Sequence, residues 1–187
     1  MRKSQIVIID DHELLRRGFI GALGNAWTVA GQAADIAEAK KIFGNLAKPP
    51  DLVVLDIALR GGDWGLNLIP WLEEVYGMAA PPVLVYTVYA DYAHVRAAVS
   101  VGARGYVSKD EGFPVLEEAM RMLMRGRTHI NPNLLFKLAA VPDMISGLTK
   151  REKEIFLLVQ QGRDNKHIAQ QLALVPRTVE CYLNRIY

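Results

Sequence analysis

The sequence predicts an α/β fold, a doubly wound sheet of five parallel strands, followed by a second, small all-α domain. Three observations support this prediction. Up to about residue 126, short apolar runs alternate with stretches of helical periodicity, and strands separated by helices favour a parallel sheet with helices on both faces. Turn-forming residues such as Asn131-Pro132-Asn133 then interrupt the pattern. Beyond them, helical periodicity predominates.

The expected strands are short and mostly apolar, and the first and third are typical of strands buried on both faces. We expect strands at residues 6–9, 28–33, 52–55, 83–86 and 105–107. We expect helices between and after them at residues 14–23, 37–46, 66–75, 93–101 and 114–124. The pattern does not give the order of the strands within the sheet.

Composition is that of an ordinary globular protein of one or two domains, with 187 residues, 51% hydrophobic and 22% charged. The single cysteine, Cys181, cannot form an internal disulfide. No signal peptide is visible, and no apolar stretch approaches the roughly 18 to 20 residues of a membrane helix. We therefore expect a cytoplasmic protein with no membrane partner. Residues 147–187 contain seven Lys or Arg against four Asp or Glu, a mildly basic balance that is weak evidence for nucleic-acid binding.

Acidic and polar residues follow four of the five expected strands. Asp10 and Asp11 end the first, Asp56 the third, Thr87 the fourth and Lys109 the fifth. The carboxyl ends of parallel strands form the ligand-binding edge of an open sheet, and three acids gathered there would repel one another without a hard cation such as Mg²⁺. If Asp56 accepts a phosphoryl group, the metal and Lys109 neutralise its charge and Thr87 can donate a hydrogen bond to it.

Each of these residues has an ordinary interpretation when taken alone. An Asp after a strand is most often a helix N-cap, Thr87 could be a turn or cap residue, and Tyr106 is typical of a half-buried packing residue. His12, beside the acids, is better interpreted as a surface histidine at a helix start than as a metal ligand. The combination of residues, not any one of them, favours a functional site.

The pattern resembles the flavodoxin-like receiver domain of two-component response regulators, and the run Asp10-Asp11-His12-Glu13-Leu14-Leu15-Arg16-Arg17-Gly18 resembles the NarL/FixJ family. By that resemblance a sensor histidine kinase phosphorylates Asp56. Asp11 and Asp56 would hold Mg²⁺ directly, Asp10 would hold it largely through water, and the backbone carbonyl of Ala58 would complete the protein ligands. Phosphorylation would pull Thr87 inward and Tyr106 would rotate to follow it, repacking the surface around residues 88–110.

The chain departs from this pattern in the loop after Asp56. The family's usual Pro is Arg60 here, and residues 61–65 make an unusual, glycine-rich and flexible loop. Lys109 is followed by Asp110 and not by Pro, as is common in this subfamily. Ala58, Val88 and Tyr89 flank the phosphoryl position and are expected to tune the lifetime of the phosphate.

The C-terminal part is predicted to be three short helices. We divide the chain into a receiver domain at residues 1–126, a linker at 127–146 that could hold a short helix over 134–140, and a helical domain at 147–187. Thr149 and Glu152 form a capping box that opens a helix running to about Gln161, with Gly162 after it. A second helix spans about 165–172 and a third 177–187, with Pro176 suited to a helix start.

Two helices joined by a tight turn outline a helix-turn-helix, and these residues resemble the LuxR-type DNA-binding domain. By matching positions Lys166, Arg177 and Thr178 would contact the DNA backbone, while Glu180, Cys181 and Asn184 would face the major groove. A typical member has Lys in place of Glu180, and Val175 replaces a Ser N-cap, which weakens that helix start by ~1 kcal/mol. The family's fourth helix is absent, so we expect either a naturally shortened protein or an engineered or incomplete chain, and we favour the latter.

The favoured function is therefore a phosphorylation-controlled transcription regulator, not an enzyme, that binds promoter DNA and forms a homodimer on activation. A second hypothesis is a protein-interaction switch or phosphate sink with a degenerate DNA-binding module, which Glu180 and the missing helix favour. A third, a hydrolase with Asp56 as nucleophile, is less favoured because Ala58 stands where a haloacid dehalogenase-like enzyme needs a second acid.

Overall fold

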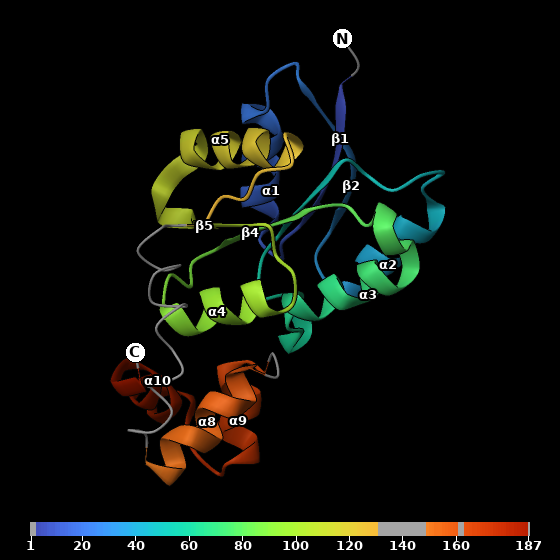
Figure 1. The fold of residues 1–187 in the computed structure, drawn as a ribbon. Helices are drawn as coiled ribbons and strands as arrows, with labels where there is room; N and C mark the ends of the chain where they lie inside the picture. Colours follow the sequence, from blue (N-terminus) through green and yellow to red (C-terminus); the bar gives the residue numbers. More distant parts are fainter. Residues whose placement is uncertain (1–2, 131–148, 161–162, 187) are drawn as a thin grey trace.

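A computed structural model describes residues 3–130, 149–160 and 163–186. Its larger part is a five-stranded parallel sheet with the order β2-β1-β3-β4-β5. Helices α1 and α5 cover one face, and α2, α3 and α4 cover the other (Figure 1). The predicted doubly wound sheet is thus confirmed, and the structure supplies the strand order that the sequence left open.

The observed bounds lie within two residues of those expected. The strands are β1 (Ser4–Ile9), β2 (Trp27–Ala33), β3 (Leu52–Leu55), β4 (Val83–Thr87) and β5 (Gly105–Ser108). The helices around them are α1 (Glu13–Ala22), α2 (Ile36–Asn45), α3 (Leu68–Tyr76), α4 (Tyr92–Ser100) and α5 (Gly112–Met124). Asp35 and Asp91 start α2 and α4, because their carboxylates accept hydrogen bonds from backbone amides of the first turn.

Alternate residues of each central strand pack into opposite cores, which explains the continuous apolar runs. In β1, Val7 and Ile9 face the cluster under α2, α3 and α4, whereas Ile6 and Ile8 face the cluster under α1 and α5. These four side chains are between 0% and 2% exposed. Their burial fixes the strand register, since a slip by one residue would exchange the two faces.

The connection from β3 to α3 is held closely against the sheet. It contains the short helical turns η1 (Arg60–Gly62) and η2 (Gly65–Asn67), and the Leu59 amide donates to the Asp63 carbonyl at 3.1 Å. A Cβ on Gly65 would lie 2.0 Å from the backbone oxygen of Asp56, so only glycine permits this approach. Trp64 is 4% exposed. The expected flexible loop is therefore hydrogen-bonded, and its tryptophan belongs to the core.

Beyond α5 the chain returns along the outer edge of the sheet. His129 forms a parallel bridge with Gly105: its amide donates to the Arg104 carbonyl at 3.1 Å, and its carbonyl accepts from the Tyr106 amide at 2.8 Å. The described chain then breaks at residue 130, so the predicted helix over 134–140 lies outside the described residues.

The C-terminal unit contains α8 (Lys150–Gln160), α9 (Asn165–Gln171) and α10 (Pro176–Ile186). The capping box is confirmed, because the Thr149 amide donates to the Glu152 carboxylate at 2.8 Å and the Glu152 amide donates to Thr149 Oγ1 at 3.3 Å. Pro176 is the first residue of α10, as predicted. Gly162 and Tyr187 lie outside the described residues. None of the described helices is both long and apolar enough to cross a membrane.

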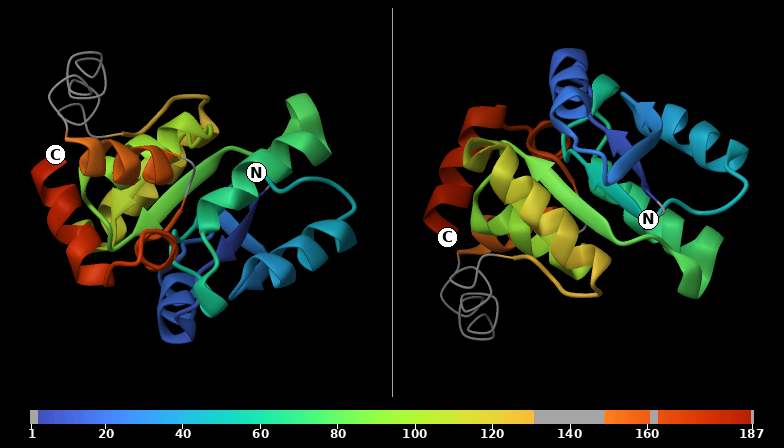
Figure 2. Two further views of the ribbon diagram at one scale, coloured as in Figure 1. Left: turned by 90° about the horizontal axis from the view of Figure 1, so that it is seen from below. Right: turned by 90° about the horizontal axis from the view of Figure 1, so that it is seen from above.

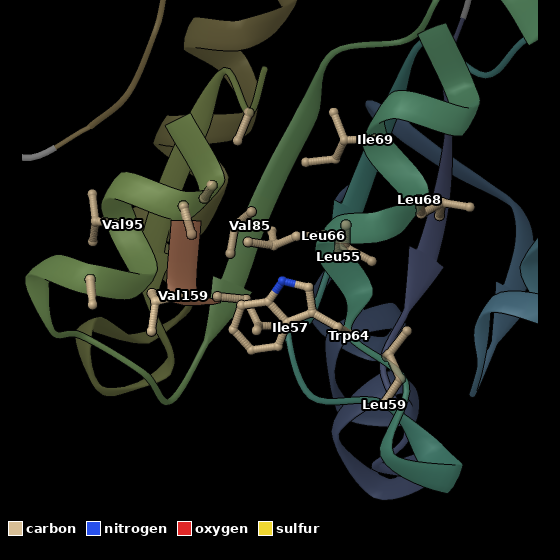
Figure 3. Close-up of a cluster of buried hydrophobic side chains, with 14 of the residues drawn as sticks. Leu55, Ile57, Leu59, Trp64, Leu66, Leu68, Ile69, Val85, Val95 and Val159 are labelled. Atoms are coloured by element: carbon tan, nitrogen blue, oxygen red, sulfur yellow. The ribbon is translucent and has the colours of Figure 1, made fainter. Parts of the chain in front are cut away.

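The C-terminal unit packs against α4 of the larger part, as the views in Figure 1 and Figure 2 show. Val95 on α4 and Val159 on α8 belong to one buried cluster, and Figure 3 shows Val159 beside Trp64. The Arg96 guanidinium lies 4.8 Å from the centre of the Phe156 ring. The two parts therefore share an apolar contact, which the sequence did not predict.

Candidate functional site

The carboxyl edge of the sheet brings together charged residues from three strands. Asp10 follows β1, Asp56 follows β3 and Lys109 follows β5. Lys109 Nζ lies 2.8 Å from Asp10 Oδ2 and 2.5 Å from Asp56 Oδ2. The two carboxylates are buried, at 2% and 3% residue exposure. A single ammonium thus compensates two buried acids.

The same edge offers oxygen ligands for a metal ion. Asp10, Asp11, His12 and Asp56 each present one potential ligand atom, and all four atoms lie within 4.8 Å of one another. Asp11 Oδ1 is buried and has no hydrogen bond from the described residues, although His12 Nδ1 lies 2.8 Å from it. Carboxylate oxygens with an unsatisfied lone pair fit a hard cation such as Mg²⁺. Ala58, whose carbonyl was also expected to contribute, lines a cavity with Asp11.

His12 lies on the surface, and it also borders the acidic group. Its side chain is 69% exposed, as predicted for a histidine at a helix start. Its ring nitrogen nevertheless contacts Asp11, which the sequence interpretation did not anticipate. Adjacency to the two acids was the only signal in the sequence.

Burial and neighbouring charges have opposite effects on the pKa values of Asp56 and Lys109. Burial raises the pKa of Asp56 above its ordinary value, and the Lys109 ammonium only partly offsets this effect. Burial would lower the pKa of Lys109, but Asp56 and Asp10 outweigh it and the pKa rises. Lys109 therefore stays charged.

The expected switch residues lie beside this pair. Thr87 is fully buried and Tyr106 is 6% exposed. The Tyr106 hydroxyl donates to the backbone oxygen of Tyr89 at 2.5 Å, and the Tyr89 amide donates to Thr87 Oγ1 at 3.4 Å. Burial raises the pKa of Tyr106 far above its ordinary value, so the hydroxyl remains a donor. Tyr106 already occupies an inner position in this structure.

The expected DNA-contacting residues lie on α9 and α10. Helix α10 buries Val179 and Leu183 against the rest of the unit. Lys166, Arg177, Glu180 and Cys181 are exposed, and Thr178 is half-buried. The side chain of Asn184 lies outside the described residues. Lys166 nevertheless lines a cavity together with Asp11 and Ala58 of the larger part, so this position lies beside the receiver sheet.

A cavity of about 340 Å³ lies between the loop after β3 and the start of α9. Its walls include Asp11, Ala58, Trp64, Tyr89, His94 and Lys166. His94 is 3% exposed and its Nδ1 lies 2.5 Å from Asp91 Oδ2. The sequence interpretation did not single out Trp64 or His94, because their proximity depends on the folded loop.

Comparison with known protein families places the chain in one class. The family described as response regulator receiver domain matches residues 6–121, and the family described as bacterial regulatory proteins, luxR family, matches residues 146–187. The chain therefore belongs to the two-component response regulators, with a receiver domain and a LuxR-type DNA-binding domain.

Individual relatives place it more narrowly in the NarL/FixJ family. The chain is 33% identical to the DNA-binding transcriptional activator DevR/DosR of Mycobacterium tuberculosis, over 97% of this chain and 86% of that protein. It is 31% identical to the oxygen regulatory protein NreC of Staphylococcus carnosus, over 97% and 88% respectively. The crystal structure of ChrA, from a heme-sensing two-component system, is 31% identical, covers 100% of this chain and 90% of its own, and superposes with a TM-score of 0.56.

Proposed function

We propose that a sensor histidine kinase transfers a phosphoryl group to Asp56, and that the phosphorylated chain controls transcription by binding promoter DNA. The observation that carries this proposal is the buried Asp56 carboxylate, which has one oxygen on Lys109 and stands among Asp10 and Asp11. In the transfer, the bond from phosphorus to the kinase histidine breaks and a bond to an Asp56 oxygen forms, while Lys109 keeps its proton.

The surrounding residues have separate roles in this transfer. Asp10, Asp11, Asp56 and the Ala58 carbonyl would hold Mg²⁺, which supplies positive charge against the phosphoryl oxygens. Lys109 supplies a second positive charge from the end of β5. Thr87, fully buried beside the acceptor, donates its hydroxyl to a phosphoryl oxygen.

The C-terminal unit is the proposed output. Helix α10 enters the major groove, with Glu180, Cys181 and Asn184 toward the bases, while Lys166, Arg177 and Thr178 hold the phosphates. A homodimer formed on activation would present two such units to two half-sites. Binding to the chromosome implies action in the cytoplasm.

The acceptor assignment is tested by labelling the chain with radioactive acetyl phosphate. Labelling is expected to require Mg²⁺ and to be lost in Asp56→Asn, because the amide cannot form the acyl phosphate. Asp110→Asn, which changes an exposed acid at the same edge, is the matched control and should label normally. Retained labelling of Asp56→Asn would contradict the assignment.

A second function is favoured by one observation, the exposed carboxylate of Glu180 on α10. A negative charge there repels DNA phosphates, which suits an output through protein contacts. Selection from a random DNA library, with and without beryllofluoride as phosphoryl mimic, separates the two functions. Enrichment of one sequence supports the transcription regulator, and its absence in both conditions supports the interaction switch.

A further inference from the structure

Arg16 lies at the end of the first turn of α1, and its side chain reaches back to the acidic pair. Its backbone amide donates to the His12 carbonyl at 3.1 Å, as in a regular helix. The half-buried guanidinium donates from Nη1 to the backbone carbonyl of Asp10. Its Nε is buried and has no hydrogen-bond partner among the described residues. A buried N–H without a partner costs free energy, so the contact with Asp10 offsets a cost that a surface arginine would not have.

The contact with Arg16 restrains the peptide unit that joins the two acids. The Asp10 carbonyl and the Asp11 amide belong to one planar group, which also includes both Cα atoms. A donor on that carbonyl therefore limits the direction in which the Asp11 side chain leaves the backbone. Asp11 Oδ1 is buried and has no hydrogen bond from the described residues, apart from its ion-pair contact with the exposed His12 ring. The position of this oxygen thus depends largely on the backbone that Arg16 holds.

The other polar atoms of Asp10 are held by groups that do not involve Arg16. Its amide donates to the Ala33 carbonyl at 3.0 Å, and Oδ1 accepts from the His12 amide at 2.8 Å. Oδ2 lies 2.8 Å from Lys109 Nζ. Loss of the Arg16 guanidinium would therefore free the Asp10 carbonyl and leave both carboxylate contacts in place.

Arg17, the next residue, carries the same charge but makes no such contact. Its side chain is 73% exposed, and its Nη2 lies 2.6 Å from Glu13 Oε1 one turn earlier on the helix. An exposed pair of this kind contributes little to stability. The two adjacent arginines therefore separate the effect of a nearby positive charge from the effect of a hydrogen bond to the backbone of the acids.

We propose that Arg16 is a positioning residue of the metal site. By holding the Asp10 carbonyl, it keeps Asp10 and Asp11 directed at the cation that phosphoryl transfer to Asp56 requires. This inference rests on the proposed function and adds a residue from outside the acidic group. A role as a simple counter-charge predicts the opposite effect of removing Arg16, because a neighbouring positive charge weakens the binding of a cation.

The test measures the binding of Mn²⁺ to the full chain from the electron paramagnetic resonance signal of the free ion. Mn²⁺ takes the same oxygen ligands as Mg²⁺. Arg16→Met keeps an unbranched side chain and removes the guanidinium, and it should raise the dissociation constant about tenfold, as is common when a group that orients metal ligands is lost. Arg17→Met is the same change on the exposed neighbour and should leave the constant unchanged. Arg16→Lys restores a charged donor of similar reach and should recover most of the affinity.

Two results would overturn the positioning role. One is an unchanged or lower dissociation constant for Arg16→Met, and the other is a failure of Arg16→Lys to recover the affinity. If Arg16→Met does not fold, Arg16→Gln replaces it, because its shorter side chain ends before the Asp10 carbonyl.

Labelling with acetyl phosphate at saturating Mg²⁺ distinguishes this inference from the proposed function. Arg16→Met should then label as the wild type does, because excess metal compensates for its lower affinity. Loss of labelling under these conditions would also overturn the positioning role, since Arg16 would then act in the transfer itself. A wild type that binds Mn²⁺ but does not label on Asp56 would overturn the proposed function and not the contribution of Arg16 to the metal site.

Discussion

At the scale of the residue, Asp56 and Lys109 show how a buried charge pair can be kept ready for reaction. Burial acts against the charge on both groups, and the ammonium is kept charged by two carboxylates that it contacts within 2.8 Å. These residues could be predicted from the sequence, because each follows a strand and the strand ends share one edge. The burial of His94 on α4 could not be predicted, since it packs against Trp64 from the distant loop after β3.

Asp91 is expected to stabilise the fold in a manner that depends on pH. Its carboxylate caps α4 and contacts His94; burial opposes its charge, but these hydrogen bonds prevail and lower its pKa below the ordinary 3.8. A lowered carboxyl pKa contributes stability above the unfolded value of 3.8, and this contribution is lost as pH falls through the lower folded value.

The corresponding variant is Asp91→Ala. It should lower the free energy of unfolding at pH 7 by about 1 kcal/mol, the usual cost of losing an N-cap. Urea unfolding at pH 7 and at pH 3 measures the effect, and the difference from wild type should shrink at pH 3. An equal difference at both pH values would show that the ionised carboxylate is not responsible.

At the scale of the element, strands and helices of the receiver were predictable, whereas the loop after β3 was not. Strand and helix positions follow from local apolar periodicity, which the folded chain preserves. The loop depends on contacts that periodicity does not contain: Ala58 bridges Trp64, and the Gly65 amide donates to the Ile57 carbonyl at 2.7 Å. Gly61 and Gly62 adopt positive φ, which explains why glycines are concentrated there.

Gly65→Ala should be strongly destabilising. The new Cβ would meet the Asp56 carbonyl, a backbone atom that cannot move without shifting the acceptor residue. We expect a loss of about 2 to 4 kcal/mol in the free energy of unfolding, with slower labelling by acetyl phosphate. Gly44→Ala in α2, where a Cβ meets nothing within 4 Å, is the control and should be neutral or stabilising by up to about 1 kcal/mol. Similar effects of the two substitutions would contradict the steric explanation.

At the scale of the whole molecule, the sequence predicted both units but not how they pack. Each unit has its own periodicity, cap and core residues. Their contact depends on residues such as the half-buried Arg96 and the buried Phe156, which belong to no motif in the sequence and meet only in the folded chain. The proposed DNA-contacting residue of α9, Lys166, therefore lies close to the receiver, on a cavity wall that also includes Asp11 and Ala58.

Lys166→Gln should weaken DNA binding uniformly across sequences. Loss of one phosphate contact is expected to reduce the slope of log K against log salt concentration by about 1, with no change in sequence preference. Binding of the beryllofluoride-treated chain to its selected site, measured from 50 to 200 mM salt, gives this slope. The control is Lys150→Gln, which changes an exposed lysine at the start of α8 and should leave the slope unchanged. An equal decrease in the slope for Lys150→Gln would show that Lys166 makes no specific contact with a DNA phosphate.

The bridge between His129 and Gly105 affects where a receiver fragment without the C-terminal unit should end. β5 is an edge strand, and a bare edge pairs readily with the edge of another chain. The segment at residues 128–130 covers part of that edge, with His129 bonded to Arg104 and Tyr106. A receiver fragment that ends at Gly126 leaves those backbone groups of β5 unpaired and should aggregate more readily. A fragment that ends at Ile130 retains the hydrogen bonds of His129 to this edge.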